Sequence, residues 1–322
     1  MKLPRRKFLH LAAGVATLPL ASRASALDYP TRPVRIIVGL PAGLNPDIVA
    51  RLIGQWLSDH LGQSFVVENR PGAGTNVATE TVVRASADGY ALLLTTPSNA
   101  FNATLYERLN FDFIRDIAPI ASLVRVPYVM EVTPSFPAKT VPEFIAYAKA
   151  NPGKINMASS GNGSTNQIFG EMFKTMAGVD LVHVPYRGNY LPDLLSGQVQ
   201  VVFTPVSASL DFIRSGKLRA LAVTTAKRVD VLPDIPTVGE FVPGYEASAW
   251  DGFGAPKNTP TEIIERLNKE VNAGLADPGL KGRLAELGNV PMPMSVAEFQ
   301  QFVAEETEKW GKVIRAANIK PE

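Results

Sequence analysis

The chain has 322 residues, of which 46% are hydrophobic and 19% are charged. This composition is typical of a globular protein with a core, not of a disordered chain, and the length corresponds to about two domains. Cysteine is absent, which excludes disulfides, thiolate metal sites and a cysteine nucleophile.

The first 26 residues have the layout of an export signal. Basic residues come first, an apolar stretch follows over residues 8–20, and Ala24-Ser25-Ala26 forms a small-residue cleavage site. The pair Arg5-Arg6 is typical of a twin-arginine signal, although Pro4 stands where Ser or Thr is usual. The alternatives are the general secretory route and an amphipathic helix that belongs to the fold. We expect residues 1–26 to be removed and the mature protein to lie in the periplasm.

The remaining chain is mildly acidic. The first 26 residues hold five of the 32 basic residues and no acid, so 27 basic and 30 acidic residues remain, a formal charge of −3. A nucleic-acid-binding protein needs a clustered basic surface, so we expect no nucleic-acid partner.

Short β-branched runs alternate with amphipathic segments, which predicts an α/β fold whose sheets are covered on both faces. The predicted strands are 34–38, 65–67, 90–95, 117–124, 128–132, 155–158, 181–184, 199–203 and 218–223, and the predicted helices are 47–60, 75–86, 140–150 and 164–177. Capping boxes at 140–143, 259–262 and 295–298 open helices. The last part of the chain is predicted to be helical, to add no strand and to pack back on the first run.

Two polar loops each join a strand to a helix start, over residues 39–47 and 159–166. The first N–H groups of a helix have no partner inside the helix and lie at the positive end of its dipole, so such loops can bind a carboxylate or phosphate. Each loop could equally be an ordinary helix cap, with Asn45, Ser164 or Thr165 as the N-cap residue. Their matching places after strands favour a shared ligand site.

Other signals favour structural roles. Gly72-Ala73-Gly74 begins like a dinucleotide-binding loop but lacks its third glycine. We interpret His60 and His183 as structural residues, and Trp250 as either a pocket residue or a core residue. A periplasmic hydrolase is disfavoured because the chain has no nucleophile elbow and no clustered histidines. We therefore expect no enzyme activity, no cofactor and no metal.

Seven motifs, in order along the chain, resemble the tripartite tricarboxylate transporter substrate-binding (Bug-type) family. They are Tyr29–Arg35, Val67–Gly74, Asp88–Tyr90, Ala150–Lys154, Ser159–Gly163, His183–Gly188 and Lys217–Val223. The resemblance implies a type II periplasmic-binding-protein fold with a ligand cleft between two α/β lobes. Residues 27–124 plus 247–322 would form lobe 1, and residues 125–246 would form lobe 2. It further implies a small carboxylate clamped by the two loops, partly through ordered water, and the membrane subunits of a tripartite transporter as partners.

Departures from the family pattern bear on the ligand. Pro46 has no N–H to donate, Leu44 adds an apolar side chain, and Thr204-Pro205 replaces an acid that is common in the family. Without that acid a ligand ammonium group loses a partner, so we expect an aromatic or aliphatic acid and not an amino acid. The alternative function is a ligand sensor that feeds a membrane kinase.

We expect the protein to be a monomer. The predicted ligand-binding residues are Pro41, Ala42, Gly43, Leu44, Asn45, Asp47, Ser98, Ser159, Ser160, Asn162, Gly163, Ser164, Thr165, Thr204 and Trp250.

Overall fold

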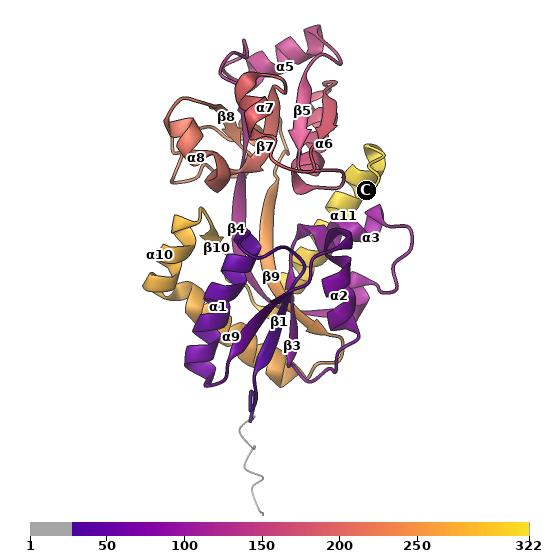
Figure 1. Cartoon of the computed structure of the whole chain (residues 1–322), viewed down its shortest axis with the longest axis vertical. Helices are drawn as coiled ribbons and strands as arrows, with labels where there is room; N and C mark the ends of the chain where they lie inside the picture. Colours follow the sequence, from indigo (N-terminus) through magenta and orange to yellow (C-terminus); the bar gives the residue numbers. More distant parts are fainter. Residues whose placement is uncertain (1–27, 322) are drawn as a thin grey trace, which may run out of the picture.

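The computed structural model describes residues 28–321, so the predicted export signal lies outside the described residues. Figure 1 shows two α/β lobes, one above the other, connected by the long strands β4 (Ile117–Val132) and β9 (Ser248–Pro256). The sheet follows the order β2-β1-β3-β9-β4-β7-β5-β6 across both lobes.

Lobe 1 is built on parallel strands. β1 (Val34–Val38) lies between β2 (Phe65–Asn69) and β3 (Ala91–Thr95) and is parallel to both, and β9 is antiparallel to β3. Since the carboxyl ends of parallel strands share one edge, the loops that enter the next helices leave lobe 1 from the same edge. The helices of this lobe are α1 (Asn45–Leu61), α2 (Asn76–Val83), α3 (Pro97–Leu105), α4 (Phe113–Asp116), α9 (Thr261–Ala276), α10 (Pro278–Glu286) and α11 (Val296–Ala316), and the short strand β10 (Val290–Pro291) pairs with β4.

Lobe 2 repeats this arrangement. β5 (Asn156–Ser159) is parallel to β6 (Val182–Pro185) and to β7 (Val201–Pro205), while β8 (Arg219–Val223) is antiparallel to β4. Its helices are α5 (Val141–Ala150), α6 (Thr165–Ala177), α7 (Leu191–Ser196) and α8 (Val206–Arg214).

The strand β4 is continuous, where the sequence predicted two strands separated at Pro127. Pro127 forms the last pair with β9, opposite Ser248, and Tyr128 forms the first pair with β7, opposite Pro205. Proline cannot donate a ladder hydrogen bond, which suits a residue at which the strand changes partners. The predicted lobe boundaries near residues 125 and 246 lie within β4 and just before β9, and we retain them as a proposal.

The strand β9 contradicts the expectation of a C-terminal part without new strands. Gly252 and Gly254 interrupt the β-branched pattern by which strands are predicted. A Cβ atom on Gly252 would collide with the ring of Phe299, and one on Gly254 would meet Ile117. The glycines are therefore required by the close approach of neighbouring side chains, not by a turn.

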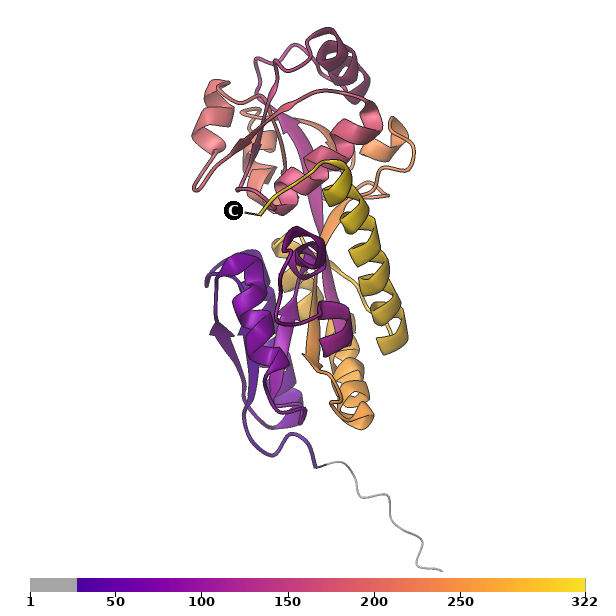
Figure 2. The ribbon, with the colours of Figure 1, turned by 90° about the vertical axis from the view of Figure 1, so that its right-hand side faces the viewer.

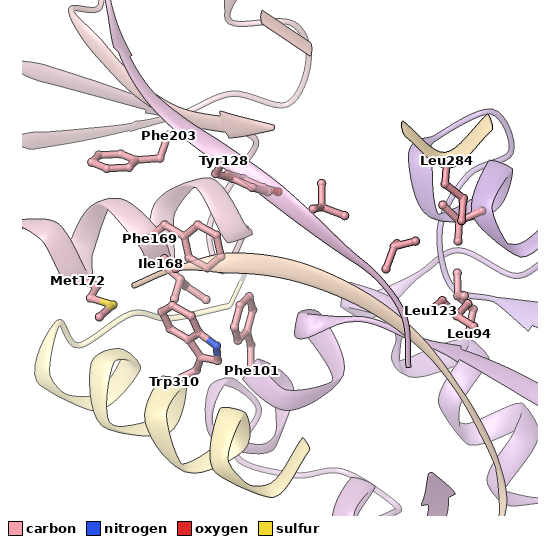
Figure 3. Close-up of a cluster of buried hydrophobic side chains, with 14 of the residues drawn as sticks. Leu94, Phe101, Leu123, Tyr128, Ile168, Phe169, Met172, Phe203, Leu284 and Trp310 are labelled. Atoms are coloured by element: carbon pink, nitrogen blue, oxygen red, sulfur yellow. The ribbon is translucent and has the colours of Figure 1, made fainter. Parts of the chain in front are cut away.

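The helix α11 joins the two lobes, as Figure 2 shows along the side of the molecule. Trp310 stacks on Phe169 of α6, with ring centroids 5.0 Å apart, and meets the edge of Phe101 of α3 at 5.7 Å; Figure 3 shows these rings together. The indole N–H groups of Trp310 and Trp250 both donate to Oε2 of Glu306, at 2.7 and 3.1 Å. The predicted return of the chain end to the first run is therefore correct, but α11 also contacts lobe 2.

Of the three predicted capping boxes, only the one at 295–298 is complete, because the Glu143 carboxylate accepts from the backbone N–H of Lys139 and not from that of Thr140. Thr140 accepts from the backbone N–H of Glu143, and Ser295 opens α11 with a full capping box. Thr259 is not a cap, because Pro260 takes that position and the hydroxyl of Thr259 donates to the carbonyl of Pro256. Within residues 28–321, no helix has both the length and the apolar character needed to cross a membrane.

Candidate functional site

The start of α6 carries unused hydrogen-bond donors. Ser164 is the N-cap, as one of the alternatives predicted, and its hydroxyl accepts from the backbone N–H of Gln167 at 3.4 Å. The N–H groups of Thr165 and Asn166 come next, and among residues 28–321 they have no hydrogen-bond acceptor. No acidic residue lies in this first turn. The helix dipole and these two donors can therefore act on an external anion.

The loop before α6 is held rigid by His183. The backbone N–H of Gly163 donates to Oε1 of Gln167 at 2.7 Å, which fixes the orientation of that amide. The Gln167 amide nitrogen then donates to Nδ1 of His183 at 3.2 Å, and Nε2 of the same ring lies 2.6 Å from Oγ of Ser159. Burial, with a smaller effect from Lys174, lowers the pKa of His183 and keeps the ring neutral.

This arrangement excludes a Ser–His nucleophile. Because Nδ1 accepts, the imidazole proton is on Nε2 and is donated to Ser159, so His183 cannot act as a base toward Ser159. Ser159 is also fully buried, and its hydroxyl accepts from the backbone N–H of Gly161. His183 is thus a satisfied strand residue, as predicted, and Ser159 shapes the loop from inside.

The loop before α1 is a different kind of site. The carboxylate of Asp47 is buried and accepts from the backbone N–H of Gly43 at 2.8 Å, from Asn69 at 2.9 Å and from Arg51 at 3.1 Å. The positive end of α1 therefore already faces an internal anion, so its attraction for a ligand carboxylate is weaker than that of α6. Asp47 organises this loop and is not free to contact a ligand.

The N-cap of α1 also differs from the expectation. Leu44 occupies that position without a side-chain cap, and Asn45 is the first helical residue. The Asn45 amide instead forms a reciprocal pair with Asn289, at 3.1 and 3.0 Å. Leu44 is 47% exposed, so it can cover a ligand.

The Asp47 contacts predict a pH-dependent contribution to stability. Burial alone would raise the pKa of Asp47, but the hydrogen bonds from Arg51, Gly43 and Asn69 outweigh it and lower the pKa below its ordinary value of 3.8. The Asp47 carboxylate stabilises the fold fully at pH values above its ordinary pKa of 3.8. This stabilisation is lost as the pH falls below 3.8 and through the lower pKa that Asp47 has in the folded protein. The variant Asp47→Asn should be less stable at pH 7 by about 1–3 kcal/mol, and the deficit should shrink toward pH 2.

Denaturant unfolding at pH 7, 4 and 2 measures this deficit. Asp230→Asn, which changes an exposed side chain, is the matched control and should differ little from the wild type at each pH. A deficit for Asp47→Asn that is constant with pH would show that the carboxylate charge is not its source.

Aromatic hydroxyls from lobe 2 complete the region near α6. The ring of Tyr128 packs edge-on against Phe169 of α6, with ring centroids 4.9 Å apart (Figure 3). Tyr190 shares a hydrogen bond of 2.6 Å with Thr204, which is buried. Sequence reasoning missed both tyrosines, although a tyrosine directly after Pro127 in the crossing strand was a usable signal.

The other predicted contacts fall into three groups. Ser98 is half-buried in the first turn of α3, beside the N-cap Thr96. Trp250 is fully buried on the α11 side of β9, against Phe299 and Phe302, so it is a core residue and not a cleft residue. The loop residues Pro41, Ala42, Gly43, Ser160 and Asn162 are exposed.

A cavity of about 580 Å³ lies elsewhere, beside the crossing strands. Residues 225–231 line it from lobe 2 and residues 288–291 line it from lobe 1, and none of the predicted ligand-binding residues does so. Within residues 28–321, no group of three or more His, Asp or Glu side chains could hold a metal ion.

Comparison with known proteins identifies the family. The model of the tripartite tricarboxylate transporter family receptor matches residues 49–319. Protein BugT of Bordetella pertussis is 34% identical over 311 residues, which cover 95% of each chain. The solved structure of Rpa4515 from R. palustris with adipate is 39% identical, has a TM-score of 0.80 and covers 92% of this chain and 100% of that one. MatC from Rhodopseudomonas palustris with bound malate is 31% identical, with a TM-score of 0.76 and coverage of 89% and 100%.

These matches confirm the predicted family and the periplasmic-binding-protein fold. The family consists of substrate-binding receptors and not of enzymes, in agreement with the sequence. The chain belongs to the tripartite tricarboxylate transporter receptor family.

Proposed function

We propose that this receptor captures a small non-amino carboxylate in the periplasm and delivers it to the membrane subunits of a tripartite transporter. The observation that carries the proposal is the pair of unused N–H groups of Thr165 and Asn166 at the start of α6, a helix with no acidic residue in its first turn. A carboxylate is the anion that such a helix start and the hydroxyl groups around it would hold.

The ligands of similar proteins support a carboxylate. Rpa4515 was solved with adipate and MatC with malate, and both are plain or hydroxylated diacids. An acid at this position of β7 would pair with the ammonium group of an amino-acid ligand, but this chain has Thr204 there. The hydroxyl of Thr204 is already hydrogen-bonded to Tyr190. The proposed ligand is therefore an aliphatic or aromatic acid without an amino group.

The two lobes would close on the ligand by a hinge motion in β4 and β9. On this proposal, α6 supplies the donors and the loop before α1 shields the ligand with Leu44. Hydrogen bonds to a charged carboxylate contribute about 1.5–3 kcal/mol each, which after the cost of binding is consistent with micromolar affinity or better. Export by the signal in residues 1–26 would place the receptor in the periplasm.

Calorimetric titration of the mature protein tests the proposal. Adipate, malate, benzoate and glutamate are titrated separately, and we expect at least one plain acid to bind with a Kd of about 1 μM or lower, corresponding to about −8 kcal/mol. Glutamate should bind at least about tenfold more weakly, because the β7 position from which an ammonium partner is expected holds Thr204 and not an acid. Submicromolar binding of an amino acid, with none of the plain acids bound, would overturn the proposal.

A further inference from the structure

Asp251 lies on the crossing strand β9, beside the start of α3. Thr95 pairs with Gly252 in antiparallel register, so the next rung places Asp251 beside Thr96, the N-cap of α3. On its other side Asp251 is paired with Val124 of β4. Side chains alternate along a strand, so Asp251 points away from the face on which Trp250 contacts α11.

The Asp251 carboxyl is buried without a full set of partners. The residue is 2% exposed, and its Oδ2 atom has no hydrogen-bond partner among residues 28–321. Buried polar atoms in proteins are nearly always paired, so an exception calls for an explanation. Tyr128 is close enough for its ionisation to be affected by Asp251, and the Tyr128 ring packs against Phe169 of α6 with ring centroids 4.9 Å apart. Asp251 therefore belongs to the region where the two lobes meet beside the α6 donors.

The surroundings favour the neutral acid. Burial raises the pKa of Asp251 from 3.8 to about 8, and burial likewise raises the pKa of Tyr128, which stays uncharged. In α1, Asp47 is held by its own donors. The first turns of α3 and α6 have no titratable side chain, since they consist of residues 97–99 and 165–167.

The charged groups nearest in sequence and register lie on the other face of β9. Arg125 pairs in register with Trp250 and bonds to Glu246. Glu306 accepts from the Trp250 indole and lies near Lys309. None of these groups places a positive charge on the face of β9 that carries the Asp251 side chain.

We propose that Asp251, in its protonated form, donates a hydrogen bond to the far carboxylate of the ligand, so that the site selects dicarboxylates over monocarboxylates. This inference rests on the proposed function, in which α6 holds the first carboxylate. A second carboxylate would lie near the start of α3, where Ser98 adds a hydroxyl and a helix-start N–H. An approaching anion favours the protonated acid further, and a buried carboxylic acid kept neutral can serve as a donor to an anion.

Matched diacids and monoacids test this selection. Adipate and hexanoate, which have the same number of carbon atoms, are titrated at pH 6.5 into the wild type, Asp251→Asn and Asp251→Ala. The wild type should bind adipate at least about tenfold more tightly than hexanoate, since a hydrogen bond to a carboxylate is among the strong ones. Asp251→Asn keeps an N–H donor and should retain most of this preference, whereas Asp251→Ala should lose it, with a larger loss of affinity for adipate than for hexanoate.

The pH dependence supplies a second readout. The acid loses its proton as the pH rises through about 8, so adipate affinity should fall between pH 6.5 and 9 in the wild type but stay constant in Asp251→Asn. Both variants can be checked for folding by circular dichroism and thermal unfolding.

The outcomes separate the two proposals. If neither acid nor any other plain carboxylate binds the wild type, the proposed function fails. If the acids bind but Asp251→Ala keeps the full preference for adipate, or if the adipate affinity of the wild type does not fall between pH 6.5 and 9, the role of Asp251 is refuted.

Discussion

Replacing Trp310 with alanine is expected to lower the free energy of unfolding by about 3–5 kcal/mol. Trp310 is fully buried, stacks on Phe169 of α6 and meets Phe101 of α3, so its removal leaves a cavity between elements of both lobes. It also withdraws one of two indole donors from Glu306. Equilibrium unfolding in urea, followed by circular dichroism, measures the loss.

Trp310→Phe separates packing from hydrogen bonding. This variant keeps an aromatic ring beside Phe169 and removes only the indole N–H and part of the volume, so it should lose less than half as much stability. Equal losses for the two variants would show that the hydrogen bond to Glu306 carries the effect. A loss below about 1 kcal/mol for Trp310→Ala would contradict the close packing of α11 against both lobes.

Thr165→Asp is expected to weaken binding of the carboxylate ligand by more than about 100-fold. The new charge would stand at the first position of α6, next to the donors that we assign to the ligand. Two like charges about 4 Å apart repel by about 4 kcal/mol at an effective dielectric constant near 20. An acid in the first turn favours a helix by about 0.3–1 kcal/mol, so the fold should be retained.

The same substitution in another helix provides the matched control. Thr261 is the exposed first residue of α9. It comes shortly after Pro256, the last residue of β9, which pairs with Ile117. This end of β9 lies away from Gly252, which pairs with Thr95 near the start of α3. Thr261→Asp changes the net charge equally and should leave the Kd unchanged by calorimetry. If both variants lose affinity alike, a general charge effect is responsible, and if neither does, α6 does not hold the ligand.

The alternation of strands and helices was predictable because local patterns encode it. The strand of residues 34–38 and the cap at Ser164 follow from β-branched runs and side-chain chemistry in neighbouring positions. The strand β9 could not be found in this way. Its glycines are dictated by Phe299 and Ile117, which are distant in sequence and meet the strand only in the folded chain.

The two loops and their helix starts follow from the sequence, but the way each loop uses its own acids and donors does not. Both have a polar loop before a helix, yet Asp47 turns back to bind Gly43 in one, while no acid does so in the other. Whether a side chain binds a ligand or the backbone of its own loop depends on how it is buried in the folded chain, and the spacing of residues in the sequence does not show this. Trp250 and Asp251 show the same limit, since strand register alone decides which of two adjacent residues faces the α11 core.

A crystal structure of the mature protein with the tightest-binding acid tests the central claim most directly. We predict a ligand carboxylate oxygen about 2.7–3.2 Å from the backbone nitrogens of Thr165 and Asn166, or joined to them through one ordered water. An acid bound in the cavity lined by residues 225–231 and 288–291, with the start of α6 facing only solvent, would contradict the account.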